Sequence, residues 1–246
     1  MGRWKRAVDG LDWFEITAFP DLVFRIREPA LAPLHGSNAW LMLGDHSSLL
    51  IDTGVGAAPL RPVVEALTRN PVVCLLTHAH YDHIGGAHEF SNRRVHRLES
   101  AILADPNPLA TQWGGWLTRE SFARPPSETF DFDSYAIHPA PPTSLVDDGD
   151  EIDLGDRRIV LIHAPGHSPG LIAVFEPETG LLFTSDALYN GRMFFDLVGS
   201  NRVHAARSIG RLLATNAKTV HPGHFESFSG TEFQRLGRET LASLAI

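Results

Sequence analysis

A dense group of metal-binding side chains directly follows an apolar segment, Val72–Leu76. Within the next seven residues stand His78, His80, Asp82 and His83. A short apolar run that begins with β-branched residues is typical of a buried strand. In α/β sheets, ligands bind at the carboxyl ends of the strands. The sequence therefore predicts a ligand site where this strand ends.

The spacing within the group favours metal binding. In an extended segment, His78 and His80 project to the same side, and a turn beginning at Asp82 can direct Asp82 and His83 to a second point nearby. Imidazoles suit zinc, and an imidazole with a carboxylate suits a second ion. A His-rich surface loop is the simpler interpretation of the whole group, and Asp82 alone could be a helix N-cap. The density of ligand-type residues favours the metal site.

Composition limits how a metal could be held. The chain of 246 residues contains one cysteine, which excludes a disulfide framework and a cysteine-rich zinc site. Any metal must therefore be held by His, Asp or Glu. The formal charge of -8 offers no basic footprint for a nucleic acid, so no nucleic-acid partner is expected.

The N-terminus is basic at Arg3, Lys5 and Arg6, but no apolar core follows. It therefore lacks the features of a secretory signal, and Arg6 breaks the myristoylation pattern. No segment approaches the length of a membrane span. We expect a cytoplasmic protein with no membrane partner. The sequence leaves the oligomeric state open, with a homodimer as one option.

Strand-like and helical segments alternate, and the chain divides into two β-rich parts that each end in a helix. The first strands are expected over Trp13–Thr17 and Leu22–Arg27. The predicted helices cover Pro59–Arg69, 98–104, Val203–Ala214 and 231–244. This order predicts two sheets packed face to face with helices outside. At this length we expect a single domain over residues 1–246.

Polar residues recur where predicted strands end in Gly or Pro turns. Besides the first group, these are Asp52, His167, Asp186 and the pair His221 and His224. Such residues would gather along one edge of the two sheets. Asp52 by itself fits a turn residue equally well.

The segment 105–144 breaks the pattern, with seven prolines and weak periodicity. A long irregular segment inside a compact domain is typical of a functional loop or lid, so we expect a lid-like insertion. Its aromatic residues either line an apolar substrate pocket or pack the loop onto the domain. The candidates are Trp113, Trp116, Phe122, Phe130 and Phe132.

Five motifs together resemble those of the metallo-β-lactamase fold hydrolases. In chain order they are Ile51–Gly54, HxHxDH at His78–His83, Pro165–His167, Ser185-Asp186 and His221–His224. The resemblance covers most of the chain. It implies an α/β fold of the αββα type, with two mixed β-sheets and helices outside.

The resemblance also implies a dinuclear metal centre. Carried over by position, the ligands are His78, His80 and His167 for one metal, Asp82, His83 and His224 for the other, and Asp186 as the bridge. The expected cofactors are two divalent ions, zinc by preference, with iron or manganese as alternatives. Asp52 would hydrogen-bond near the ligand loop. His163 and His221 match no ligand position. They would either stabilise the fold or hydrogen-bond to the metal ligands.

The implied reaction is hydrolysis by a hydroxide that bridges the metals, since zinc lowers the pKa of bound water to about 7. The target is the carbonyl of a small-molecule acyl substrate, a thioester or an ester. Asp82 would carry a proton to the leaving group. The hydroxyl of Tyr189 would stabilise the oxyanion.

Within the superfamily, the chain looks most like members that act as acyl-CoA thioesterases. The shared features are Gly149–Asp156, Tyr189 and Pro222–Phe225, and the Tyr189 position also occurs in acyl-homoserine lactonases. An acyl-CoA-like thioester is therefore favoured, with lactonase or β-lactamase activity as the alternative. Two other classes remain open. One is a mononuclear iron persulfide dioxygenase, since that family also carries HxHxDH, and the other is a non-catalytic binding protein on the same fold.

Overall fold

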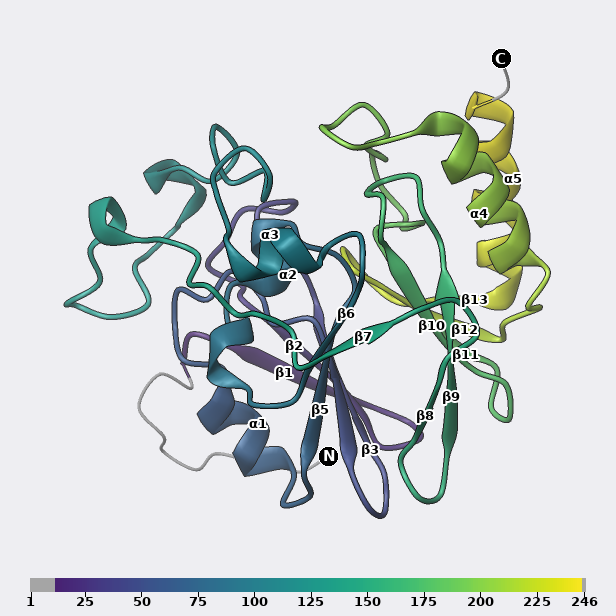
Figure 1. Cartoon of the computed structure of the whole chain (residues 1–246), viewed down its shortest axis with the longest axis horizontal. Helices are drawn as coiled ribbons and strands as arrows, with labels where there is room; N and C mark the ends of the chain where they lie inside the picture. Colours follow the sequence, from purple (N-terminus) through teal and green to yellow (C-terminus); the bar gives the residue numbers. More distant parts are fainter. Residues whose placement is uncertain (1–11, 245–246) are drawn as a thin grey trace.

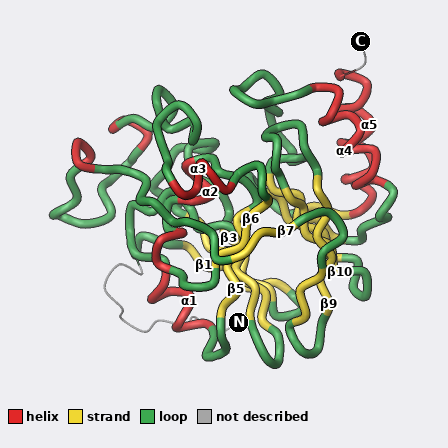
Figure 2. Tube along the Cα trace, viewed as in Figure 1, coloured by secondary structure: helices red, strands yellow, loops and turns green. Residues whose placement is uncertain are grey.

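The computed structural model describes residues 12–244, so the basic N-terminal segment lies outside it. Two mixed β-sheets pack face to face, and helices cover both outer faces (Figure 1). Figure 2 shows the strands at the centre of the molecule and the helices at its periphery. The α/β sandwich of αββα type expected from the sequence is confirmed. Among the described residues, no helix has both the length and the apolar character needed to cross a membrane.

The first sheet has seven strands in chain order. They are β1 (Glu15–Phe19), β2 (Val23–Arg27), β3 (Ala39–Leu43), β4 (Ser48–Ile51), β5 (Val72–Leu76), β6 (Arg93–His96) and β7 (Ser144–Val146). Strands β1 to β4 are antiparallel, whereas β4 to β7 are parallel. Parallel strands need crossover connections, and these contain the helices α1 (Arg61–Leu67), α2 (Tyr81–Ile84) and α3 (Ser100–Ala104). The carboxyl ends of β4, β5 and β6 therefore meet at one edge.

The second sheet has six strands in the order β13-β12-β11-β10-β9-β8. They are β8 (Glu151–Asp153), β9 (Arg158–His163), β10 (Ile172–Glu176), β11 (Leu181–Ser185), β12 (Thr219–Pro222) and β13 (Phe228–Ser229). Its outer face is covered by α4 (Arg202–Leu213) and α5 (Gly230–Leu244) (Figure 1). Only β11 and β12 run parallel in this sheet, so their carboxyl ends also share an edge.

Successive strand residues enter different layers of the core. Leu49 and Ile51 of β4 are buried between the sheets with Leu161 and Phe183, while Leu50 packs in the layer beneath the helices. This alternation follows from the two-residue period of a strand. Because both faces of β4 and β5 are buried, these strands have continuous apolar sequences rather than alternating ones.

The segment 105–144 is irregular up to Ser144, where β7 begins, apart from two short 3-10 helices, Arg119–Ser121 and Phe132–Ser134. It lies against the helical layer of the first sheet (Figure 1). The N–H of Tyr81, within the ligand loop, donates a hydrogen bond to the carbonyl of Thr111 at 2.8 Å. The segment therefore contacts the predicted metal centre directly, and its function as a lid stays a prediction.

Some element boundaries differ from the sequence expectation. The first strand begins at Glu15 rather than Trp13, and the fully buried indole of Trp13 packs in the core instead. The helix expected over Pro59–Arg69 is restricted to Arg61–Leu67. The last strand, β13, has only two residues, too few for a periodic pattern to be visible.

Candidate metal centre

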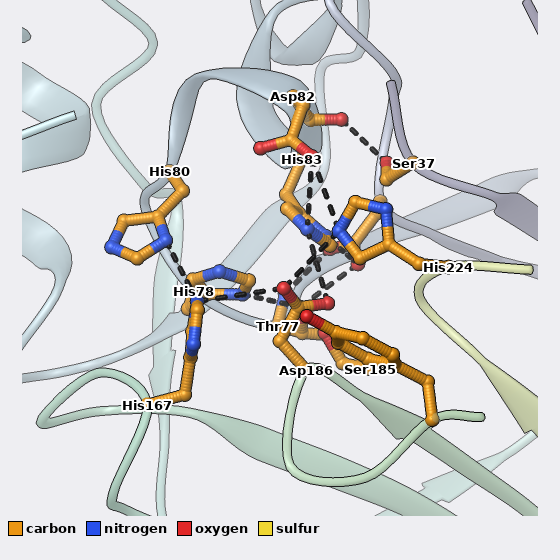
Figure 3. Close-up of polar contacts among 12 residues, drawn as sticks. Ser37, Thr77, His78, His80, Asp82, His83, His167, Ser185, Asp186 and His224 are labelled. Carbon is orange, nitrogen blue, oxygen red and sulfur yellow. Dashed lines mark hydrogen bonds and ion pairs between the residues drawn. The ribbon is translucent and has the colours of Figure 1, made fainter. Parts of the chain in front are cut away.

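The polar residues that follow the strands meet at one edge of the sandwich. Asp52 follows β4, His78 follows β5, Asp186 follows β11 and His224 follows β12. All the predicted metal-binding side chains are buried, and Figure 3 shows them directed toward a common centre. These residues are His78, His80, Asp82, His83, His167, Asp186 and His224.

The first group consists of His78, His80 and His167, whose nitrogen atoms lie within 4.8 Å of one another. His167 Nδ1 lies 2.9 Å from the carbonyl oxygen of Phe194 and donates to it. The other nitrogen, Nε2, therefore presents a lone pair, and it lies 2.9 Å from His80 Nδ1. Burial lowers the pKa of His78, His80 and His167. All three are thus neutral at pH 7, which is the form that binds metals.

The second group consists of Asp82, His83 and His224, again with ligand atoms within 4.8 Å. Asp186 lies between the two groups (Figure 3). Its Oδ2 is 3.2 Å from His224 Nε2 and 3.4 Å from His167 Nε2, and its Oδ1 is 3.4 Å from His83 Nε2. Its carboxylate therefore reaches both groups, as a bridging ligand would.

The donor set fits divalent cations. Within residues 12–244, three buried atoms at the centre lack hydrogen-bond partners: His78 Nε2, His83 Nε2 and Asp186 Oδ1. Burying polar atoms without partners costs free energy, and a metal would bind these nitrogens and this oxygen. Burial lowers the pKa of His83, but Asp82, Asp52 and Asp186 outweigh it and raise this pKa to about 10. The carboxylates thus favour positive charge here, which divalent ions would supply.

Asp52 belongs to neither ligand group but hydrogen-bonds to residues of the centre. It holds a left-handed backbone conformation at φ 62°, and its Oδ2 accepts hydrogen bonds from His83 Nδ1 at 2.7 Å and Thr77 Oγ1 at 2.8 Å. A carboxylate on one imidazole nitrogen fixes the tautomer and aims the other nitrogen at the metal. Thr77 Oγ1 also lies 2.7 Å from Ser185 Oγ, so the same network joins the two sheets.

Glu99 is a second buried carboxylate at the centre, and its sequence context did not single it out. Its Oε2 accepts a hydrogen bond from the N–H of Ala79 at 3.2 Å, and its Oε1 accepts one from Gly170 at 2.6 Å. Ala79 separates His78 from His80, and Gly170 lies in the loop of His167. Glu99 therefore ties together the two loops that supply the first group. In sequence, a Glu just before a helix suggests only a helix terminus.

The remaining histidines lie outside both groups. His163 Nε2 donates to the carbonyl of Pro169 at 2.9 Å, and its ring stacks on His96 at 4.2 Å. His221 Nδ1 bonds with Ser227 Oγ at 2.8 Å, and its ring packs against Trp40 at 4.4 Å. His163 shapes the loop that carries His167, whereas His221 packs in the core.

A narrow cavity of about 40 Å³ opens beside the metal-binding groups. Trp116 lines it, together with its neighbour in the 105–144 segment Gln112. Trp113 and Phe122 do not, because they pack against Tyr135 and Trp13 respectively. The remaining walls are Leu34, His80, Tyr81, Asp82, His167, Asp186, Tyr189, Phe194, Leu197 and His224.

Two other predicted aromatic residues pack within the loop, since Phe130 and Phe132 both contact Phe122. Tyr189, by contrast, is at the centre, with its ring 5.2 Å from that of His224. Its hydroxyl donates a hydrogen bond to the carbonyl oxygen of Arg192 at 2.7 Å. Sequence alone did not reveal Leu34, Phe194 or Leu197, because apolar loop residues carry no distinctive pattern.

Glu28 is a further buried carboxylate, beside the loop that follows Asp52. Trp13 Nε1 and the N–H of Val55 each donate to it at 2.9 Å. Burial raises the pKa of Glu28 to about 7, although both hydrogen bonds lower it. Folding stability therefore depends on the ionisation of this side chain.

The free energy of unfolding should fall as Glu28 ionises. Because its folded pKa is raised above the ordinary 4.5 to about 7, the stability it contributes is present below 4.5 and is lost as the pH rises through 7. From about pH 5 to about pH 8, wild type should lose about 2.5 kcal/mol relative to Glu28→Gln. Urea unfolding of both proteins at several pH values measures this, and parallel stability curves would contradict it.

The comparisons with known proteins agree with this centre. Residues 32–224 match the family model of the metallo-beta-lactamase superfamily. The chain belongs to that superfamily. The acyl-coenzyme A thioesterase MBLAC2 of Homo sapiens is 29% identical over 97% of this chain and 91% of its own length. The Gallus gallus protein of the same name is 31% identical over 97% and 90%.

Solved structures of the superfamily share the fold. A metallo-beta-lactamase from Pontibacter korlensis aligns with a TM-score of 0.68 at 19% identity, covering 94% of this chain and 98% of its own. The protein TTHA1623, solved in a di-iron-bound form, aligns with a TM-score of 0.61 at 26% identity, covering 84% and 96%. Family membership and these relatives make the chain a metal-dependent hydrolase.

Proposed function

We propose that the chain is a dinuclear metallohydrolase that cleaves acyl-CoA-like thioesters. The position of Asp186 carries the proposal, because its carboxylate lies within 3.4 Å of His167 in one group and of both His83 and His224 in the other. A carboxylate shared in this way is suited to hold two cations close together. The di-iron-bound form of TTHA1623 supports the same count of metals.

The proposed ligands are His78, His80 and His167 for one ion and Asp82, His83 and His224 for the other, with Asp186 between them. Zinc is the preferred ion for this His and Asp set, and iron or manganese would also be accepted. When bound, two such ions would polarise a thioester carbonyl and lower the pKa of a water to about 7.

Residues of the chain would supply the proton transfer and the apolar surroundings of the reaction. Asp82 lies in the cavity wall, where its carboxylate can take the proton of the attacking water and deliver it to the leaving group. A thiolate needs less of this help than an amine, because it is already a good leaving group. Leu34, Phe194 and Leu197 give the cavity apolar walls, and apolar surroundings strengthen electrostatic contacts within a site.

The thioester assignment rests on the two relatives named as acyl-coenzyme A thioesterases, which match 97% of this chain. A hollow of about 320 Å³ beside the cavity, the apolar hollow, is lined largely by Pro33, Leu34, Trp116, Phe194 and Leu197, and its apolar part suits an acyl chain. His35, Arg192 and Asp196 complete its wall. A small-molecule acyl substrate is therefore proposed as the partner of the site.

Metal analysis combined with a substrate panel tests the proposal. We expect two metals per chain and hydrolysis of acyl-CoA in preference to lactones, nitrocefin or lactoylglutathione. Preferred cleavage of a lactone or nitrocefin would retain the dinuclear mechanism and overturn the substrate. One iron per chain with oxygen uptake on glutathione persulfide would instead identify a dioxygenase. Two bound metals with no turnover of any substrate would indicate a binding protein.

Replacement of Tyr189 by phenylalanine separates two functions of its hydroxyl. If the hydroxyl stabilises the oxyanion, Tyr189→Phe should lower kcat about a hundredfold with metal content unchanged. The hydroxyl also donates to the Arg192 carbonyl, and if this bond is its only function, KM should change and kcat should not. We expect the loss in kcat. Steady-state kinetics with metal analysis measures both, and an unaltered kcat would exclude the oxyanion function.

A further inference from the structure

A large hollow adjoins the metal centre on the side of the second sheet. It measures about 730 Å³ and lies between the loop 189–196 and the helices α4 and α5. Three arginines line it, Arg192, Arg202 and Arg235, and we call it the arginine hollow. Tyr189 lines both this hollow and the narrow cavity at the metal centre. The two spaces therefore meet at a residue whose ring packs on His224.

The apolar hollow adjoins the same cavity more broadly. It shares Leu34, Trp116, Phe194 and Leu197 with the cavity, whereas the arginine hollow shares only Tyr189. Arg192 and Asp196 line both hollows, so the mainly apolar space and the arginine hollow adjoin each other as well as the cavity at the metal centre. A ligand spanning both spaces would have an apolar end and an anionic end.

Two of the arginines are available to an anion. The Arg192 guanidinium lies 5.0 Å from the Phe194 ring centroid, and Arg202 donates to the carbonyl of Ser243 at 3.1 Å. Within the described chain, neither forms an ion pair with a carboxylate. Arg235 differs, because it pairs with Glu232 and Glu239.

The balance of charge in the hollow also favours an anion. Besides the arginines, the ionisable residues of its lining are Asp196 and Glu239, and Glu239 is already paired with Arg235. The whole chain carries a charge of -8, so a local excess of guanidinium groups beside the centre stands out. Arginine binds phosphate through several parallel N–H donors, which makes it the preferred phosphate-binding side chain.

Resting on the proposed thioesterase function, we propose that the arginine hollow binds the phosphate-bearing nucleotide end of coenzyme A. Arg192 and Arg202 contact its phosphates, and the acyl chain occupies the apolar hollow. The thioester then lies at the metal centre, in the cavity that adjoins both hollows. The hydrogen bond from Tyr189 to the Arg192 carbonyl fixes the position of Arg192 relative to the centre.

The test compares two thioesters that differ only in the nucleotide. Octanoyl-CoA carries it, and S-octanoylpantetheine, which keeps the whole pantetheine arm, lacks it. In the metal-loaded enzyme, the double variant Arg192→Gln/Arg202→Gln should raise KM for octanoyl-CoA about tenfold, since hydrogen bonds to charged groups are involved. Its kcat/KM for the truncated thioester should stay within about twofold, because that substrate does not reach the hollow. The KM of wild type for octanoyl-CoA should also rise with ionic strength.

Arg238→Gln is the matched control. Arg238 is an exposed residue of the same helix as Arg235, and it contacts Gln234 rather than the hollow. This variant makes the same Arg-to-Gln change at one position, removing one positive charge where the double variant removes two, and its kinetics on both thioesters should equal those of wild type. Equal effects of the double variant and the control on octanoyl-CoA would overturn the proposal.

Direct binding of adenosine 3′,5′-bisphosphate distinguishes this inference from the proposed function. Calorimetry on the metal-loaded protein should detect binding that the double variant loses. Wild type that cleaves neither thioester yet binds this nucleotide through the two arginines would refute the thioesterase and retain the nucleotide site. Wild type that cleaves octanoyl-CoA with no dependence on the two arginines would refute the site and retain the thioesterase.

Discussion

Replacing Asp186 with alanine should lower kcat/KM for acyl-CoA about a thousandfold, a loss typical of removing a central electrostatic group from an active site. The physical reason is the position of the Asp186 carboxylate, whose two oxygens lie 3.2 to 3.4 Å from nitrogens of His83, His167 and His224. Without this carboxylate, the two groups have no common ligand and the centre loses one of its two negative charges. Both metals should then bind more weakly. Kinetics and metal analysis on the same preparation measure both effects.

His80→Ala provides the contrast. His80 belongs only to the first group, so this variant should keep one metal per chain, held by Asp82, His83 and His224, while activity is lost. Asp105→Ala, which removes an exposed carboxylate at the end of α3, should change neither measurement. If Asp186→Ala retains two metals and wild-type turnover, the dinuclear model is wrong.

The metal-binding residues could be predicted because the information lies in short stretches of sequence. HxHxDH supplies His78, His80, Asp82 and His83 within six positions, and the preceding apolar run places them at a strand end. His167, Asp186 and His224 follow the same rule at the ends of other strands. Their assembly in the structure follows from the parallel pairs β4 with β5 and β11 with β12, because parallel neighbours end at the same edge.

The supporting contacts could not be predicted, because they join residues far apart in the chain. Glu99 meets Gly170 across 71 positions, and Glu28 meets Val55 across 27. Neither pairing leaves a periodic or spaced pattern in the sequence. The aromatic residues of 105–144 show the same limit, since a segment without periodicity does not reveal which side chains face the cavity. Trp116 lines it, while Trp113 and Phe122 pack within the loop layer.

Glu99→Ala should weaken metal binding by the first group about ten- to a hundredfold, the usual effect of losing a residue that orients ligands. The carboxylate contacts no ligand side chain. It accepts hydrogen bonds from the backbone of Ala79 and Gly170, which belong to the two loops carrying His78, His80 and His167. Without it, the two loops can move apart, and the three imidazole nitrogens then no longer point at one metal. Competition with a chromogenic chelator measures the affinity, and one of the two metals should be released first.

Glu89→Ala separates the orienting effect from a general loss of stability. Glu89 also accepts two backbone hydrogen bonds, from Leu60 at 3.0 Å and Arg61 at 2.8 Å, but these belong to the start of α1 and not to a ligand loop. Each variant leaves two backbone donors without their acceptor. The cost is about 1–3 kcal/mol for each buried donor of Glu99→Ala, and it is smaller for Glu89→Ala, whose two bonds are part-buried and exposed. Both should therefore unfold more easily in urea, and only Glu99→Ala should bind metal more weakly. Equal metal affinity in the two variants would reduce Glu99 to a purely structural carboxylate.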